Sequence, residues 1–397
     1  MNLLPKFHLP IRQFHFFPVA VAIILSTPLA GLAQKPKLPK PRILEHEIHI
    51  SRDQLTGEMR LIPAENTESS AGAIVPVIRS RVDLVEVQCA VTAADGTAVR
   101  GLTQQDFRLW EDSAEQKISS FDAAATPAGI ALVIDASPSI YRQLGDMRGI
   151  AQSLAKSLQP QDEVAVVAFA DETQMLLPFS RDRNLLNAAL ASPQLAHVAN
   201  SSESFIYQAA YLSALRLFGG RSGRKAMILL TDGEDSALGL TWDPESMAPK
   251  PGADKSLAFQ DVARAIAASG IELYVISTEP RPPALTDEGL AARRGESLIT
   301  PAARNAKIPL HTLYLAELTR EVGGELYFLT ELGSLAGIYH SIALKIEAEY
   351  TLGYYPEAGA ATPGWRRLHV ELRPDAHALA QAQLTYRTTY YVPASPQ

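Results

Sequence analysis

Cysteine is almost absent from this chain. Cys89 is the only one in 397 residues, so no intrachain disulfide can form. Blocks of five or more like charges are also absent, and the formal net charge is only −7. Nucleic acid and anionic membrane surfaces are therefore not expected as partners. The histidines are scattered without ligand spacing, which disfavours a metal centre built from nitrogen ligands.

The overall composition is that of a globular protein. Hydrophobic residues make up 47% and charged residues 20% of the chain, which are ordinary values. Its length allows two or three domains at roughly 100–200 residues each. With no disulfide available, stability must come from packing and from any bound metal.

The first 33 residues have the pattern of a secretory signal peptide. Lys6 and Arg12 form a basic start, and residues 16–32 are uncharged and largely apolar. Small residues at Gly31 and Ala33 predict cleavage before Gln34. The alternative is an uncleaved anchor, but the apolar run contains two prolines and is short for a span of about 20 residues. We expect a secreted or periplasmic, envelope-located protein with no membrane span after cleavage.

The mature chain divides into four segments by pattern. Residues 34–81 begin with alternating Lys and Pro and remain polar, which predicts a linker. Residues 82–124 alternate as β-strands do, with Cys89 as a small buried hydrophobe on one strand face. Residues 349–393 return to strand-like patterns. We expect this C-terminal β segment to pair with 82–124 into a flanking β-sandwich-like region.

Residues 125–348 alternate between apolar strands and amphipathic helices. The run 130–134 is continuously apolar and ends in Asp135, as in a strand buried on both faces. Such alternation predicts an α/β fold: a doubly wound, mainly parallel, Rossmann-like sheet with helices on both faces. Two long insertions that contain proline, 236–254 and 280–312, interrupt the pattern. Further strands are expected at 164–169, 175–179, 226–230, 272–277 and 325–329, and helices at 142–158, 204–218, 257–269, 313–322 and 335–348.

Oxygen-bearing side chains follow two of the predicted parallel strands. The first strand ends in Asp135, followed by Ser137 and Ser139, and a later strand ends in Thr-Asp-Gly with Asp232. Ligands bind beyond the carboxyl ends of strands in doubly wound sheets, so these side chains are expected to converge. An all-oxygen set of carboxylates and hydroxyls suits hard cations such as Mg²⁺, Mn²⁺ or Ca²⁺.

These motifs resemble those of von Willebrand factor type A domains, in particular of their bacterial relatives. Asp-x-Ser-x-Ser after the first strand and the Asp of Thr-Asp-Gly are signatures of the metal-ion-dependent adhesion site of that family. Asp135, Ser137, Ser139 and Asp232 match it residue by residue. Ser204 stands where the relatives have a Thr after two glycines, so it keeps the hydroxyl and loses the glycines. The likeness extends over roughly 82–392.

The resemblance implies a non-enzymatic adhesion or assembly module. It implies one divalent cation, Mg²⁺ first with Mn²⁺ or Ca²⁺ as alternatives, held by Asp135, Ser137, Ser139, Ser204 and Asp232. It also implies a protein partner that supplies an Asp or Glu carboxylate. The patterns leave open the identity of this partner and the oligomeric state.

Other functions compete with that of an adhesion module. The departure at Ser204 leaves open a structural envelope protein whose metal site is vestigial. A metal-dependent hydrolase or a phosphotransferase with an Asp nucleophile is disfavoured. The phosphotransferase needs an acid two residues after its nucleophile, where this chain has Ser137, and a hydroxyl does not supply that acid near neutral pH.

Overall fold

The structure is a computed structural model of the 397-residue chain. It describes residues 38–44, 48–52, 59–63, 84–94, 97–123, 126–143, 147–198, 203–221, 223–236, 241–242, 249–250, 257–286, 297–329, 335–356, 362–373 and 382–392. The signal segment expected at 1–33 lies outside the described residues.

A seven-stranded sheet forms the centre of the α/β domain, in the order β1-β10-β9-β8-β11-β14-β15. Neighbouring strands among β9, β8, β11, β14 and β15 pair in parallel. At one edge, β10 pairs antiparallel with β9, and β1 pairs antiparallel with β10. The predicted doubly wound, mainly parallel sheet is therefore confirmed. Its strands are β1 (Arg42–Ile43), β8 (Gly129–Asp135), β9 (Glu163–Phe169), β10 (Thr173–Ser180), β11 (Lys225–Thr231), β14 (Glu272–Ser277) and β15 (Glu325–Phe328).

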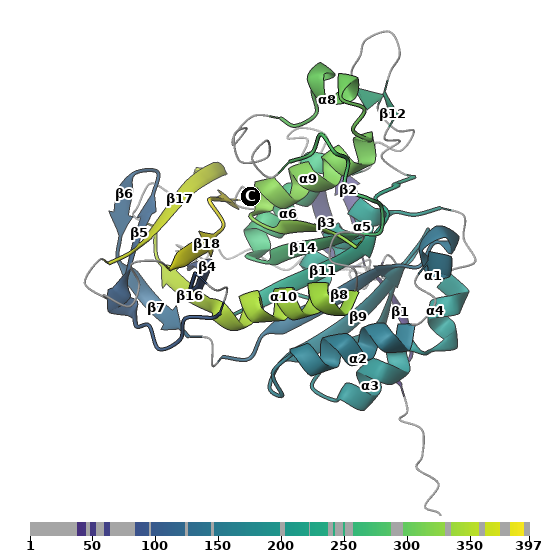
Figure 1. Ribbon diagram of the computed structural model, residues 1–397, viewed down its shortest axis with the longest axis horizontal. Coiled ribbons are helices and arrows are strands. Elements are labelled where there is room, and N and C mark those ends of the chain that lie inside the picture. Colours follow the sequence, from purple (N-terminus) through teal and green to yellow (C-terminus); the bar gives the residue numbers. More distant parts are fainter. Residues whose placement is uncertain are drawn as a thin grey trace, which may run out of the picture. The chain divides into compact units, whose positions relative to one another are not determined.

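Helices cover both faces of this sheet (Figure 1). Helices α5, α6 and α9 contribute to one hydrophobic core, and α2, α3, α4 and α10 contribute to the other. Among the helices of the described ranges, none is both long and apolar enough to cross a membrane. The helices are α1 (Pro138–Gln143), α2 (Met147–Ser157), α3 (Arg183–Leu190), α4 (Pro193–Val198), α5 (Ile206–Arg216), α6 (Phe259–Ser269), α8 (Pro301–Asn305), α9 (Leu310–Val322) and α10 (Leu335–Ala348).

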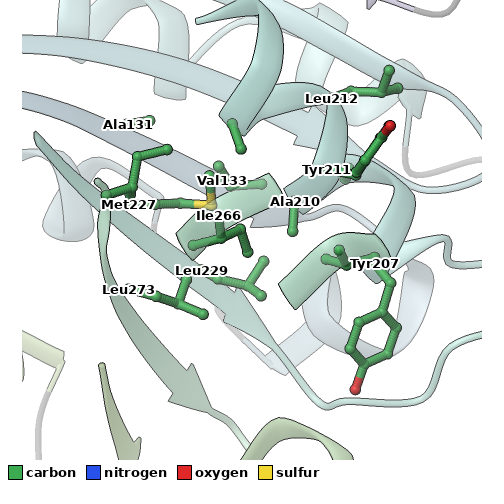
Figure 2. Close-up of a cluster of buried hydrophobic side chains, with 14 of the residues drawn as sticks. Ala131, Val133, Tyr207, Ala210, Tyr211, Leu212, Met227, Leu229, Ile266 and Leu273 are labelled. Carbon is green, nitrogen blue, oxygen red and sulfur yellow. The ribbon is translucent and has the colours of Figure 1, made fainter. Parts of the chain in front are cut away.

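Burial on both faces explains the continuous apolar run of β8. Ala131 and Val133 belong to the core beneath α5 and α6, whereas Leu132 belongs to the core on the opposite face. Figure 2 shows Ala131 and Val133 beside Met227 of β11, with side chains of α5 and α6 packed against them. Successive side chains of a strand point to opposite faces, so each one here needs an apolar neighbour.

The segment expected to be a linker, 34–81, contains three short strands. β1 pairs antiparallel with β10, and Leu44 beside it is only 1% exposed within the core. β2 (Ile48–Arg52) and β3 (Met59–Pro63) form a hairpin. The linker prediction is therefore wrong for the part that holds β1, because Ile43 and Leu44 are apolar enough to dock on the open edge of β10.

Two four-stranded antiparallel sheets flank the α/β domain. Their orders are β18-β4-β16-β7 and β19-β17-β5-β6, and they share one core, in which Cys89 is 1% exposed. Each sheet combines strands that precede the α/β domain with strands that follow it. In the first, β16 lies between β4 and β7, and in the second, β17 lies beside β5. The strands are β4 (Val85–Thr92), β5 (Phe107–Glu111), β6 (Ala114–Gln116), β7 (Ile118–Asp122), β16 (Glu349–Tyr354), β17 (Gly364–Leu372), β18 (Gln383–Tyr386) and β19 (Thr389–Val392).

The two insertions contain local structure where they are described. In the first, β12 (Thr241–Trp242) pairs with β13 (Pro249–Lys250). In the second, Leu285, Leu298 and Ile308 form a small apolar cluster with residues of α9 and β15. This cluster packs the second insertion against the α/β domain.

The sandwich joins the α/β domain at the amino-terminal ends of the parallel strands. Helix α10 runs directly into β16. Lys225, which begins β11, pairs with Glu86 of β4 at 3.3 Å. Arg387, between β18 and β19, donates to the carbonyl of Ala267 in the last turn of α6 at 2.9 Å. A cation at a helix C-terminus is favourable, so this contact stabilises the junction.

A pair of buried carboxyl groups lies at this same junction. Glu349 begins β16 and is 1% exposed, and Tyr274 of β14 donates a hydrogen bond to it at 3.3 Å. Burial and the neighbouring Glu272 carboxylate raise the pKa of Glu349 well above its ordinary value, although Arg224 opposes this. Burial also raises the pKa of Glu272. Like charges in a shared buried site disfavour ionisation, so we expect the pair to hold a shared proton to a higher pH than an ordinary glutamate does.

Replacing Glu349 by glutamine is expected to make the protein more stable above about pH 5. The folded-state pKa of Glu349 lies above the unfolded value, so stability declines as pH rises between the two. Glutamine does not titrate, and the advantage of Glu349→Gln should grow with pH. Chemical denaturation at about pH 5 and about pH 8 measures it, with Glu172→Gln at an exposed site as the control. A stability difference that stays constant over this range would contradict the shared proton.

Candidate metal centre

The predicted site residues lie at the carboxyl ends of β8 and β11. These two strands are neighbours at the centre of the sheet, where the chain order reverses: β9 and β10 extend one way, and β14 and β15 the other. Such a switch point opens a crevice between the loops that leave the two strands. Asp135 is the last residue of β8, and Asp232 follows Thr231, the last residue of β11.

Asp135 is fully buried, with 0% of its surface exposed. Its Oδ1 accepts a hydrogen bond from the backbone N–H of Ser137 at 2.9 Å. Its Oδ2 accepts from the hydroxyls of Thr231 at 2.8 Å and Ser204 at 3.1 Å. The carboxylate is thus fixed from three segments of the chain that are distant in sequence.

Asp232 lies on the same network of hydroxyl groups. Ser139 Oγ donates to Asp232 Oδ2 at 2.8 Å, and Ser139 Oγ lies 3.1 Å from Ser137 Oγ. The other oxygen, Oδ1, accepts from the backbone N–H of Glu234 at 3.0 Å. Ser137 and Asp232 are each 6% exposed. The structure therefore brings all five predicted residues together in one buried set of oxygen atoms.

Ser204 reaches this set from a loop. A helix was expected to begin at this residue, but α5 begins at Ile206. The main chain at 203–205 is extended or irregular, and the N–H of Phe205 donates to the carbonyl of Ala170 at 2.8 Å. Ser204 nevertheless points its hydroxyl at Asp135 and is 5% exposed.

Thr231 belongs to the site and was not among the predicted ligands. Its hydroxyl donates to Asp135 and accepts from the N–H of Gly233 at 3.0 Å, so it joins the two strand ends. Its place directly before Asp232 was the available sequence signal. Gly233 has a φ of +93°, and a Cβ there would lie 2.8 Å from Leu315 of α9. The chain needs glycine at this position to turn away from the sheet.

Two further residues of the loop after β11 contact the Ser204 loop. Ser236 Oγ accepts from the N–H of Ser204 at 3.1 Å, and the N–H of Ser236 donates to the carbonyl of Ser204 at 2.8 Å. Asp235 Oδ2 accepts from the N–H of Tyr207 in the first turn of α5 at 3.2 Å. The sequence provided no signal for these contacts, which join positions far apart in the chain.

The site concentrates negative charge, because the carboxylates of Asp135 and Asp232 act on each other within it. Within the described part of the chain, no Lys, Arg or His nitrogen makes an ion pair with Asp135 or Asp232. Burial, followed by the Asp232 carboxylate, raises the pKa of Asp135 to about 6 against the opposing hydrogen bonds from Ser137 and Thr231. Buried charge that lacks a counter-charge is costly, so the site favours a cation.

The donor set fits a hard divalent cation. Two carboxylates and three serine hydroxyls offer only oxygen, as Mg²⁺, Mn²⁺ and Ca²⁺ require. No group of three or more His, Cys, Asp or Glu suited to a metal occurs among the described residues. A cation here would therefore depend on the hydroxyl ligands as well as on the two carboxylates.

Comparison with known proteins gives a family for this domain. A model of the von Willebrand factor type A domain matches residues 129–292. No curated protein sequence matches the chain.

Three of the solved structures to which the chain is similar are the following. An aerotolerance-related membrane protein from Bacteroides fragilis is 19% identical, covers 55% of this chain and 98% of its own, and has a TM-score of 0.37. The von Willebrand domain of the type V pili tip protein Mfa5 from Porphyromonas gingivalis is 13% identical, with coverages of 55% and 96% and a TM-score of 0.36. Mussel byssus proximal thread matrix protein 1, with a zinc-occupied MIDAS motif, is 15% identical, with coverages of 60% and 50% and a TM-score of 0.36.

At identities and TM-scores this low, the chemistry of the site follows only from the residues of this chain. The family match itself spans β8, which ends in Asp135, and β11, which precedes Asp232. This chain contains a von Willebrand factor type A domain, and the candidate metal centre lies within it.

Proposed function

We propose that this protein is a secreted or envelope-located, non-enzymatic binding module. Its type A domain would use one divalent cation, held by Asp135, Ser137, Ser139, Ser204 and Asp232, to bind a carboxylate of a protein partner. The observation that carries the proposal is the burial of Asp135 and Asp232 beside three serine hydroxyls, with no cationic side chain paired to either among the described residues. The secreted location rests on the pattern of residues 1–33.

The arrangement favours recognition over bond breaking. A bound cation would supply positive charge and a coordination position for an anionic oxygen from outside the domain. Asp135 accepts three hydrogen bonds and Asp232 accepts two, so both carboxylates are held in fixed positions, as ligands of one cation would be. Magnesium is the first candidate, with Mn²⁺ and Ca²⁺ as alternatives.

The alternative function, a structural envelope protein with a vestigial site, is less well supported. The feature that suggested a vestigial site is Ser204, which stands in place of a threonine and lacks the two preceding glycines. Its hydroxyl still lies 3.1 Å from Asp135 Oδ2, within a fully connected oxygen network. A site that had lost its role would not need to keep two carboxylates buried at this cost.

Metal binding is the first expected property. Titration calorimetry of the full chain with Mg²⁺, Mn²⁺, Ca²⁺ and Zn²⁺ should show one saturable site. We expect Asp135→Asn to weaken that binding by more than about a hundredfold, since loss of even an outer partner of a metal ligand costs 10–100-fold. The control is Asp122→Asn on β7 of the sandwich, which should bind as the unaltered protein does. Equal affinity in Asp135→Asn would remove the site assignment.

The metal should stabilise the protein more at higher pH. The pKa of Asp135, about 6, lies above its ordinary value of 3.8, so the metal-free protein loses stability as pH rises from about 4 to about 6. The loss approaches about 3 kcal/mol, because each pKa unit corresponds to about 1.4 kcal/mol. A cation bound to the ionised carboxylate offsets this loss. The rise in Tm at saturating Mg²⁺ should therefore be larger at about pH 7.5 than at about pH 5. A rise that is independent of pH would contradict this linkage.

Partner capture tests the function itself. The immobilised full chain should retain a protein from an envelope extract in Mg²⁺ and release it in chelator, and Asp135→Asn should not retain it. The captured protein should in turn lose binding when its contacting Asp or Glu is amidated. Capture that is equal with chelator and with Asp135→Asn would favour the structural protein with a vestigial site.

A further inference from the structure

The helix that follows Ser204 receives no side-chain hydrogen bond from its own N-cap residue. Helix α5 begins at Ile206, and its N-cap, Phe205, has no side-chain oxygen to accept a hydrogen bond from the first turn. The first amides of a helix need such an acceptor from outside the helix. Phe205 does not provide it, and a residue from another part of the chain supplies one such acceptor.

The loop after β11 provides the missing acceptor. Asp235 is 6% exposed, and its carboxylate accepts from the N–H of Tyr207, the second residue of α5, at 3.2 Å. A carboxylate at this end of a helix also interacts favourably with the helix dipole. Asp235 thus caps a helix that lies 28 residues earlier in the chain.

Ser236 holds the same loop by its main chain and its side chain. Its Oγ accepts from the N–H of Ser204 at 3.1 Å, and its N–H donates to the carbonyl of Ser204 at 2.8 Å. Both backbone polar groups of Ser204 are therefore bound to one residue. We call these contacts of Asp235 and Ser236 the 235–236 clasp.

The clasp connects two parts of the metal centre. Asp235 and Ser236 follow Asp232 on the same loop, and both form hydrogen bonds with the segment that carries Ser204. With its backbone fixed, Ser204 directs its hydroxyl to Asp135 Oδ2. A ligand held in place before the cation arrives does not have to be ordered on binding, and this raises affinity.

We propose that Asp235 and Ser236 are positioning residues that fix Ser204 in the metal centre, an inference that rests on the proposed metal-binding function. Asp235 acts through the amide of Tyr207, and Ser236 acts through the backbone of Ser204. The clasp thus holds the Ser204 loop with contacts from the loop after β11.

The test compares metal affinity with local order in three variants of the full chain. Asp235→Ala removes the acceptor, Asp235→Asn keeps an acceptor oxygen without the charge, and Ser236→Ala removes one of the two Ser236 contacts. The control is Asp182→Ala, which removes an equivalent carboxylate cap from α3, where Asp182 accepts from Asn184 at 2.8 Å. Mn²⁺ affinity is measured by titration calorimetry, and amide exchange of residues 203–208 is measured by mass spectrometry on the metal-free protein.

We expect Asp235→Ala to weaken Mn²⁺ binding about five- to tenfold, in line with the loss of one helix cap. Its residues 203–208 should exchange faster. Asp235→Asn should retain most of the affinity, and Ser236→Ala should lose less than Asp235→Ala, because its backbone contact remains. Asp182→Ala should lose comparable stability while its Mn²⁺ affinity stays unchanged, a separation that a merely structural role would not produce.

Three results would overturn the inference. Unchanged Mn²⁺ affinity in Asp235→Ala, with the unaltered protein binding normally, would exclude a positioning role and leave the proposed function standing. An affinity loss in Asp235→Asn as large as in Asp235→Ala would indicate that the charge of Asp235 acts on the cation directly. Absence of Mn²⁺ binding by the unaltered protein would remove the proposed function and this inference together.

Discussion

The rest of this site depends on two carboxylates that are buried at the ends of neighbouring strands and that no cationic side chain of the described residues pairs with. Asp135 and Asp232 end up side by side because β8 and β11 run parallel at the point where the sheet order reverses. Serine and threonine hydroxyls and two backbone N–H groups donate to their oxygens but carry no charge. The raised pKa of Asp135 is the expected response of such a group to burial and to its neighbour. A bound divalent cation would neutralise this charge while leaving both groups ionised.

The two carboxylates lie apart from the regions of the fold that stabilise the chain. Continuous apolar strands form two cores, one on each face of the sheet, and the oxygen set occupies the carboxyl ends. The amino-terminal ends face the sandwich, where Lys225 and Arg387 make charged contacts across the junction. The sequence of the loops at the carboxyl ends can therefore vary without loss of the contacts that join the opposite end of the sheet to the sandwich.

Much of the site was predictable because its signals are local. Asp135 and Asp232 each follow a continuous apolar run, and parallel strands end at one edge. Other features depend on how distant loops meet. The contact between Ser204 and Ser236 spans 32 residues, and no periodicity encodes it. The edge strand β1 is two residues long, too short for a period to show, and was taken for linker. Helices α3 and α4 are also short, and the pattern of strands and helices did not predict them.

Anomalous diffraction from crystals of the full chain grown with Mn²⁺ tests the central claim most directly. We predict one strong peak enclosed by the oxygens of Asp135, Ser137, Ser139, Ser204 and Asp232, and no peak there in crystals of Asp135→Asn. An empty site at saturating Mn²⁺, or a peak bound by other residues, would contradict the assignment of these two carboxylates to a metal centre.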